Sequence, residues 1–425
     1  AVLVPSFLAA KSAGMSPDEA AVVSWKVGMA TLVFMGVIKT VTAFFGEQIR
    51  RIIPQAGLLG SLAGVGITLL GFIPLMHMYE VPLVGIVALG LMLYSLVGKY
   101  RLPMNIPGAF AAVAVGSAIY YALGLLNQLG PSFSLPEADL IFALPLPTLE
   151  WTDELRTSLA YLPFAIPFGL LTIVGGINVN ESARCAGDEY RTRDILLTEA
   201  FSTLIAGLFG GVVQSTPYIG HPAYKAMGAR AAYTIATGIF VGLGGIFGYV
   251  SWIVAAVPAA AVAPILLFVG LEITGQAYSV VPRKHYPAIF LALLPVVGEI
   301  VRIAVATILF DSGIIGNWPV GHDALVLLEV SSLLGHGFIL TSMLWAAGVA
   351  MMIDNRKLAA ASYFGILAVL SIFGLVHSVK PGGDVYLPWT LGGEQLATSL
   401  NIAVAYLVLA AMFLLLPSGK RNPDG

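Results

Sequence analysis

The chain of 425 residues is much more apolar than a water-soluble protein, with 58% hydrophobic residues, only 10% charged residues and a mean hydropathy of +0.89. Soluble domains carry about 25% charged residues, so the composition excludes a protein whose whole surface faces water. The net charge of −2 argues against nucleic acid as a partner, because that requires a concentrated basic face. A single cysteine, Cys185, excludes a disulfide framework and a multi-cysteine metal site. We therefore expect the lipid bilayer to be the surrounding solvent.

The apolar segments follow one another along the whole chain. A helix that crosses a bilayer needs about 20 mostly apolar residues. The candidate spans are 20–45, 58–77, 82–97, 106–123, 159–180, 195–212, 232–251, 258–278, 287–310, 325–353, 357–378 and 399–418. Two further pieces, 1–14 and 217–230, are too short or too broken to span as plain helices. The chain opens without methionine in an apolar run, so we expect helices upstream of Ala1 to be missing from this sequence.

The loop charges predict the orientation. Basic loops fall on one side of the predicted spans, and the opposite loops, including the long loop 124–158, are mainly acidic. By the positive-inside rule the basic side is cytoplasmic, which predicts a multi-pass membrane protein with a cytoplasmic C-terminus. This assignment requires that 217–230 crosses the membrane as an interrupted element.

The two halves share glycine and proline positions at a constant offset of 210 residues: Gly28 and Gly238, Pro54 and Pro264, Gly60 and Gly270. Their predicted orientations are opposite. Inverted repeats that each contain a broken segment are a sequence signature of secondary transporters.

The stretch 177–188, followed by 214–222, carries the polar chemistry. Pro217 and Pro222 cannot donate backbone hydrogen bonds, so a continuous helix is excluded there. Non-helical backbone at membrane depth persists only where it lines a cavity or is buried in protein. A helical turn from Ala223 to Arg230 would direct its positive end into such a cavity. The break therefore predicts a site for a planar, polar, weakly anionic solute, with these polar side chains beside it: Gln214, Ser215, Thr216, Tyr218 and His221.

Each candidate residue also has a structural interpretation, and the sequence leaves both open. Ser215 and Thr216 either bind solute or only satisfy freed backbone groups, and Tyr218 either contacts solute or packs. His221 is either a proton site, since its unperturbed pKa lies near neutrality, or an interfacial histidine.

Asn178 and Asn180 are costly in lipid unless they are paired. Glu181 either binds a proton or substrate, or forms a helix-end ion pair with Arg184.

Other polar residues give weaker signals. Lys26 and Lys39 are long enough to snorkel to the interface, and Glu299 and Arg302 can neutralise one another. The histidines 77, 322, 336 and 377 are isolated, and no pair has metal-ligand spacing. The chain has no phosphate loop, nucleophile elbow or HExxH pattern. We therefore expect neither an enzyme nor a cofactor.

At these residues the chain resembles the bacterial xanthine/uracil/vitamin C permeases, the nucleobase:cation symporter-2 and AzgA-like group. The segments that resemble it are INVNESARCAGD, LLTEAFSTLIAGLFGG, STPYIGHPAYKAMGAR and VPAAAVAPILLFVG. The likeness extends to about residue 355 and is strongest over 175–285.

The resemblance implies inverted seven-helix repeats, with substrate between two half-helices. The implied parts are a core domain (1–53 and 159–255), a gate domain (54–123 and 256–353), the loop 124–158 and two added C-terminal helices (354–425). Residues 1–14 would be the first half-helix, which adds Pro5, Ser6 and Phe7 to the candidates. A bacterial inner membrane and a homodimer are also implied.

Two departures from the family pattern affect the choice of substrate. The family has acidic residues where this chain has Asn178 and Gly220, and we expect Glu181 and His221 to substitute for them. The resemblance implies proton- or cation-coupled uptake of a nucleobase, with H⁺ or Na⁺ as the coupling ion, and this is the leading hypothesis. The loss of both acids favours a small-anion transporter on the same fold as the alternative, and a non-transporting scaffold subunit is the third.

Overall fold

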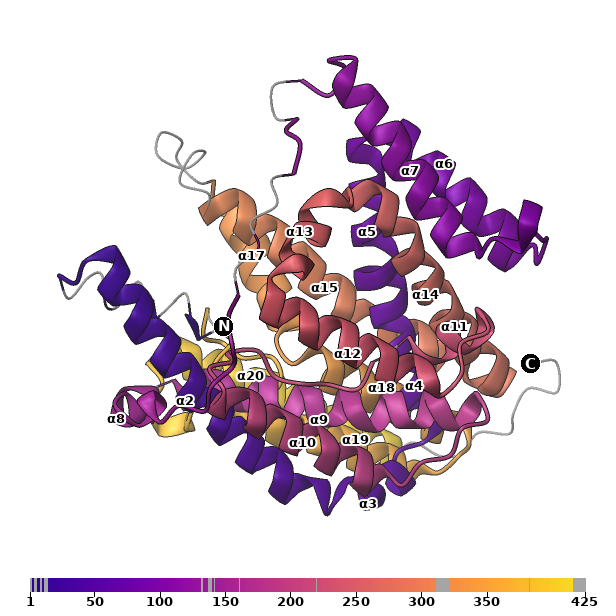
Figure 1. Cartoon of the computed structure of the whole chain (residues 1–425). Helices are drawn as coiled ribbons and strands as arrows, with labels where there is room; N and C mark the ends of the chain where they lie inside the picture. The colour runs from indigo at the N-terminus through magenta and orange to yellow at the C-terminus, as the bar shows by residue number, and fades with distance from the viewer. Residues whose placement is uncertain are drawn as a thin grey trace. The chain divides into compact units, whose positions relative to one another are not determined.

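The structure, a computed structural model, describes residues 2–3, 6–7, 10, 14–130, 133–136, 140, 142–159, 161–218, 220–310, 321–381 and 383–415. Every regular element in these residues is a helix, which confirms the predicted all-α class (Figure 1). The chain forms two compact units. The first contains residues 1–64, 147–218 and 276–425, and the second contains 65–146 and 219–275.

The N-terminal part of the first unit is a layer of three long helices. α2 (Pro17–Ala43) packs against α10 (Thr192–Leu208) and α9 (Leu162–Cys185), and the short α3 (Gly46–Ile52) and α8 (Leu155–Leu159) join this group (Figure 1). The Ser16 side chain and the Glu19 carboxylate form a capping box that starts α2. A Cβ atom at Gly36 would lie 2.5 Å from the Leu204 side chain, so α2 and α10 approach closely because this position has none.

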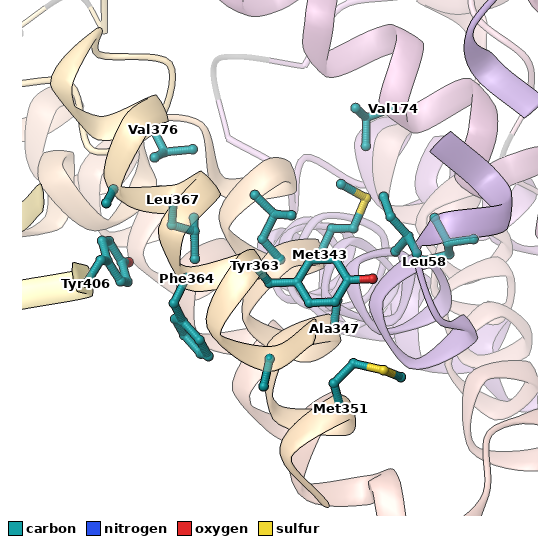
Figure 2. Close-up of a cluster of buried hydrophobic side chains, with 14 of the residues drawn as sticks. Leu58, Val174, Met343, Ala347, Met351, Tyr363, Phe364, Leu367, Val376 and Tyr406 are labelled. Atoms are coloured by element: carbon teal, nitrogen blue, oxygen red, sulfur yellow. The ribbon is translucent and has the colours of Figure 1, made fainter. Parts of the chain in front are cut away.

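The C-terminal part of the first unit consists of α15 (Tyr286–Phe310), α17 (His322–Gly335), α18 (Phe338–Ile353), α19 (Lys357–Ile372) and α20 (Gly393–Leu415). α19 packs against α18 and α20, and α15 packs against α17 and α18. Figure 2 shows the apolar core of this unit, to which α4 (Gln55–Ile67) contributes Leu58 and α9 contributes Val174. Met343, Tyr363 and Phe364 lie between them and Tyr406 of α20. The last two helices are therefore built into the core of this unit.

The predicted span 325–353 is not one helix, because α17 and α18 meet at a bend of 64°. Gly337 has φ +73° at the break, and a Cβ atom there would lie 2.3 Å from the Leu375 carbonyl oxygen. The backbone N–H of His377 donates to the His336 carbonyl oxygen at 3.0 Å. The loop after α19 thus fills the break, and His336 and His377, isolated in the sequence, are adjacent in the fold.

The second unit contains the end of α4, the π-helical turn η1 (Thr68–Phe72), α5 (Ile73–Glu80), α6 (Pro82–Met92), the π-helical turn η2 (Leu93–Val97) and α7 (Gly108–Leu125). It continues with α11 (His221–Ala226), α12 (Ala232–Phe247), α13 (Tyr249–Ala256) and most of α14 (Ala259–Val280). α6 packs along α7 (Figure 1). The predicted span 232–251 is wrong as a straight helix, because α12 and α13 meet at 103° where Gly248 has φ +75°.

Short 3₁₀ turns complete the described elements, at Pro103–Asn105, Glu150–Thr152, Arg283–His285 and Pro388–Thr390. Within the described residues, six helices are long and apolar enough to cross a membrane, or up to eight if each bent pair is one span. The predicted all-helical class is therefore confirmed, and these helices have the length and composition that a multi-pass membrane protein requires. The inverted repeats and the core and gate domains stay predictions.

Candidate functional site

A non-helical segment follows α10 in the first unit. α10 ends at Leu208, Gly210 has φ +89°, and no helix begins before His221 among the described residues. The Trp25 indole N–H of α2 donates to the Gly210 carbonyl oxygen at 2.8 Å, and the Ser215 backbone N–H donates to Thr203 Oγ1 at 3.2 Å. Side chains of α2 and α10 thus satisfy polar backbone groups that a continuous helix would have paired.

A buried ion pair lies against this segment. Lys39 Nζ of α2 is 2.6 Å from Glu199 Oε1 of α10, and the two side chains are 1% and 2% exposed. Lys39 Nζ also donates to the Ser215 carbonyl oxygen at 3.0 Å. The interpretation of Lys39 as a snorkelling residue is therefore wrong, because a carboxylate and a carbonyl oxygen inside the unit bind its ammonium group.

Glu199 was not a candidate in the sequence analysis. Its other carboxylate oxygen, Oε2, is buried and has no hydrogen-bond partner in the structure. A Cβ atom at Gly176 of α9 would lie 2.8 Å from this oxygen. The available signal was an acid in the middle of an apolar span, which is a functional candidate by default. Among the described residues, one carboxylate oxygen of Glu199 therefore binds Lys39, and the other is buried without a hydrogen bond.

Glu181, near the end of α9, has a different environment. Arg184 contacts both of its oxygens, Arg50 Nη1 lies 3.1 Å from Oε2, and Gln55 Nε2 donates to Oε1 at 3.1 Å. The pair with Arg184 is the structural alternative that the sequence left open. Glu47 on α3 extends the cluster through Arg50 and Arg51. Both Glu181 oxygens are thus satisfied by cations, and a coupling role for Glu181 stays a prediction.

The two asparagines of α9 are buried. Asn178 Nδ2 donates to Ser61 Oγ of α4 at 2.7 Å, and Asn180 Nδ2 donates to Thr192 Oγ1 at 3.0 Å. The Oδ1 atoms of both are buried without a partner in the structure. The cost of placing an amide in an apolar span is therefore only partly offset.

The other predicted site residues are divided between the two units. Gln214 Oε1 accepts from Thr172 Oγ1 at 3.2 Å, whereas Thr216 and Tyr218 are exposed. Gly220 and His221 belong to the second unit, where they start α11. α11 covers His221–Ala226 rather than the predicted 223–230. It starts earlier because Pro222 is tolerated in a first helical turn, and Gly228 with φ +92° follows its end.

The N-terminal candidates lie close to the non-helical segment. Ser6 Oγ donates to Ser24 Oγ of α2 at 3.0 Å. Phe7 lines an apolar cavity of about 310 Å³ together with Leu3, Ala21, Ser24, Trp25 and Val212. Pro5 lies outside the described residues. The structure thus brings 6–7 and 210–212 to one face of α2.

No protein-family model and no curated protein sequence matches the chain. The resemblance to nucleobase permeases therefore stays an interpretation of residue patterns. What the geometry offers is a protonatable carboxylate, a buried ammonium group and a non-helical segment, joined by direct contacts.

Proposed function

We propose that the chain is a secondary transporter in which Glu199 couples proton movement to the non-helical segment 209–218. One observation carries the proposal: Lys39 contacts both the Glu199 carboxylate and the Ser215 backbone carbonyl. A change in charge at the acid therefore acts on the segment through Lys39.

The coupling follows from the cost of burying charge. Lys39 stays charged in an apolar interior because Glu199 compensates it. When a proton binds to the Glu199 carboxylate, the Lys39 ammonium group loses its counter-charge and its burial becomes unfavourable. The contact from Lys39 to the Ser215 carbonyl is then the link through which segment 209–218 is displaced. Release of the proton restores the pair.

For the solute we propose a nucleobase or a similar small heterocycle. Two arguments support this class. The sequence predicts a site for a planar, polar solute beside Gln214, Ser215 and Tyr218, and the chain resembles nucleobase permeases. Residues 209–218 contain no acidic residue, and this observation favours a small anion as the second candidate. We further propose a homodimer in a bacterial inner membrane, with its C-terminus in the cytoplasm.

Purified protein in liposomes tests the proposal. We expect accumulation of labelled uracil, xanthine or guanine under an inward proton gradient, with sulfate, bicarbonate and a sodium gradient as parallel arms. Glu199→Gln should abolish uphill accumulation while it preserves exchange of solute between the two sides. Glu80→Gln, at an exposed acid of the second unit, is the matched control.

Full proton-driven accumulation by Glu199→Gln would contradict the role of Glu199. Accumulation of sulfate or bicarbonate alone would select the anion transporter. A wild-type protein that moves none of these solutes would favour the scaffold hypothesis. The variants Glu181→Gln and His221→Ala test the two coupling residues predicted from the sequence in the same assay.

A further inference from the structure

A second cavity lies in the C-terminal part of the first unit, apart from the residues proposed for transport. Its volume is about 360 Å³, and it is bordered by α15, α17, the loop 378–381 and the first turns of α20. Its lining includes four charged side chains and several hydroxyl or amide groups, among them Arg302, Glu329, Lys380, Glu394, Ser332 and Thr398. Sites for small molecules have about this size, roughly 300–1,000 Å³.

Buried hydrogen bonds fix the loop that forms one wall. His336 Nδ1 lies 3.0 Å from the Ser378 carbonyl oxygen. His377 Nδ1 lies 2.6 Å from the Leu333 carbonyl oxygen, and its Nε2 lies 2.7 Å from the Tyr406 hydroxyl. Leu333 and Ser378 themselves line the cavity. The two histidines therefore hold α17, the loop and α20 together, so that the cavity has a preformed wall.

The charges of the lining have both signs. Arg302 on α15 donates through Nε and Nη2 to Glu299, each at 2.7 Å, so its guanidinium group has a fixed direction. Lys380 adds a cation from the loop, whereas Glu329 and Glu394 add carboxylates from α17 and α20. Within the part of the chain that the structure describes, no ion pair joins Lys380 to either of these two acids.

This charge arrangement selects among ligands. A simple anion would meet the two carboxylates, and a simple cation would meet Lys380 and Arg302. The described residues contain no cluster of three or more metal-binding side chains. A ligand that carries an anionic group and an ammonium group on a short linker offers a partner of opposite charge both to the cations and to the carboxylates of the lining.

We propose that this cavity binds a small zwitterion of that kind. The same chemistry occurs in free amino acids and in an ethanolamine phosphate headgroup of a lipid. The apolar side chains of Leu325, Leu328 and Val379 in the lining are compatible with either a free amino acid or a lipid headgroup. The proposal does not depend on transport by segment 209–218.

Calorimetry and thermal unfolding of the full chain in a neutral detergent test the site. We expect O-phosphoethanolamine or β-alanine to bind and to raise the melting temperature, and ethanolamine alone and inorganic phosphate alone to do neither. Lys380→Met and Glu394→Gln should each weaken binding at least tenfold. Glu80→Gln, which removes an exposed acid of the other unit, should leave binding unchanged.

A lipid arm identifies the source of the ligand. Mass spectrometry of protein from nanodiscs that contain phosphatidylethanolamine or phosphatidylglycerol counts the lipids that remain bound. A lipid headgroup site is identified if the wild-type protein retains phosphatidylethanolamine, Lys380→Met does not, and the soluble probes do not bind. Equal binding of phosphate alone or of ethanolamine alone would overturn the proposal. So would the absence of zwitterion binding in both arms, or full binding by Lys380→Met and Glu394→Gln.

Discussion

Two buried glutamates on neighbouring helices of the first unit have opposite surroundings. Glu181 of α9 and Glu199 of α10 are each 2% exposed. Glu181 is bound by two arginines and an amide, and both of its oxygens have partners. Among the described residues, Glu199 has one lysine as its ionic partner and one buried oxygen without a hydrogen bond. The two carboxylates are therefore equally buried, but Glu181 has more positively charged partners than Glu199.

The difference separates a structural acid from one suited to change its charge. Two guanidinium groups favour the ionised form of a carboxyl group and oppose proton binding. A single ammonium group leaves a closer balance between desolvation and attraction. The number of charged partners, rather than depth, is thus the property by which a coupling acid should be sought here.

The largest expected effect comes from Lys39→Met. It leaves the Glu199 carboxylate buried without a counter-charge, which costs about 3–5 kcal/mol for a broken buried pair. We expect a large fall in the thermal unfolding temperature in detergent. The double variant with Glu199→Gln should recover most of this loss, because no charge then remains unpaired. A double variant as unstable as Lys39→Met would show that the lysine acts through packing instead.

Glu181→Gln should have a smaller effect on stability and none on coupling. Replacing the carboxylate by an amide removes charge-assisted hydrogen bonds worth about 1.5–3 kcal/mol. The loss is limited because Arg50 and Arg184 are partly exposed and can be hydrated instead. We expect lower resistance to chemical unfolding with proton-driven uptake retained. Loss of uptake in a protein that stays folded would return the coupling role to Glu181.

Gly176→Ala tests the space beside Glu199 Oε2, the oxygen that does not contact Lys39. The added methyl group would lie 2.8 Å from Glu199 Oε2 and from the Leu196 side chain, and overpacking costs about 1–3 kcal/mol. We expect reduced uptake and a lower melting temperature. Gly175→Ala is the matched control, because among the described residues no atom beyond its own stretch of helix lies within 4 Å of the added Cβ. Equal behaviour of the two variants would mean that this space is not needed.

The smallest effect concerns Glu47, in α3 beyond the end of the α2 span. The hydrogen bond from Arg50, assisted by Thr192 and Arg51, lowers the pKa of Glu47 to about 2. A lowered pKa stabilises the fold above the ordinary value of 4.5, and this contribution is lost as the pH falls from there towards about 2. Glu47→Gln should flatten the dependence of melting temperature on pH in this window. An unchanged slope would show that other acids dominate.

The sequence predicted the helical class and most helix positions because hydropathy and helix length are local properties. α2 and α15 begin within a few residues of the predicted spans 20–45 and 287–310. The bends at Gly248 and Gly337 were not predicted. Both regions are mainly apolar, so hydropathy alone does not reveal the bends, and the Leu375 carbonyl that lies beside Gly337 comes from a distant loop.

The site was predicted less completely. The non-helical backbone at 214–218 followed from Pro217 and the polar residues around it. The pair of Lys39 with Glu199 joins positions 160 residues apart in the sequence, and helical spacing on either helix gives no sign of its partner. The same reason hid the contact between His336 and His377, because each lies in a different loop. Local patterns revealed where the backbone breaks, but not which side chains meet there.

The carbonyl group of Leu375, which occupies the space beside Gly337, has a consequence for biosynthesis. α18 and α19 separate these two residues, so a ribosome completes the break in the helix pair well before it makes the loop that fills it. During that interval the His336 carbonyl lacks the N–H of His377 that it accepts in the finished protein. We expect a chain truncated after Ile353 to be degraded at the membrane, even though it keeps Lys39, Glu199 and the segment 209–218. The final two helices, beyond the region of family resemblance, would then be part of the folding unit and not a removable addition.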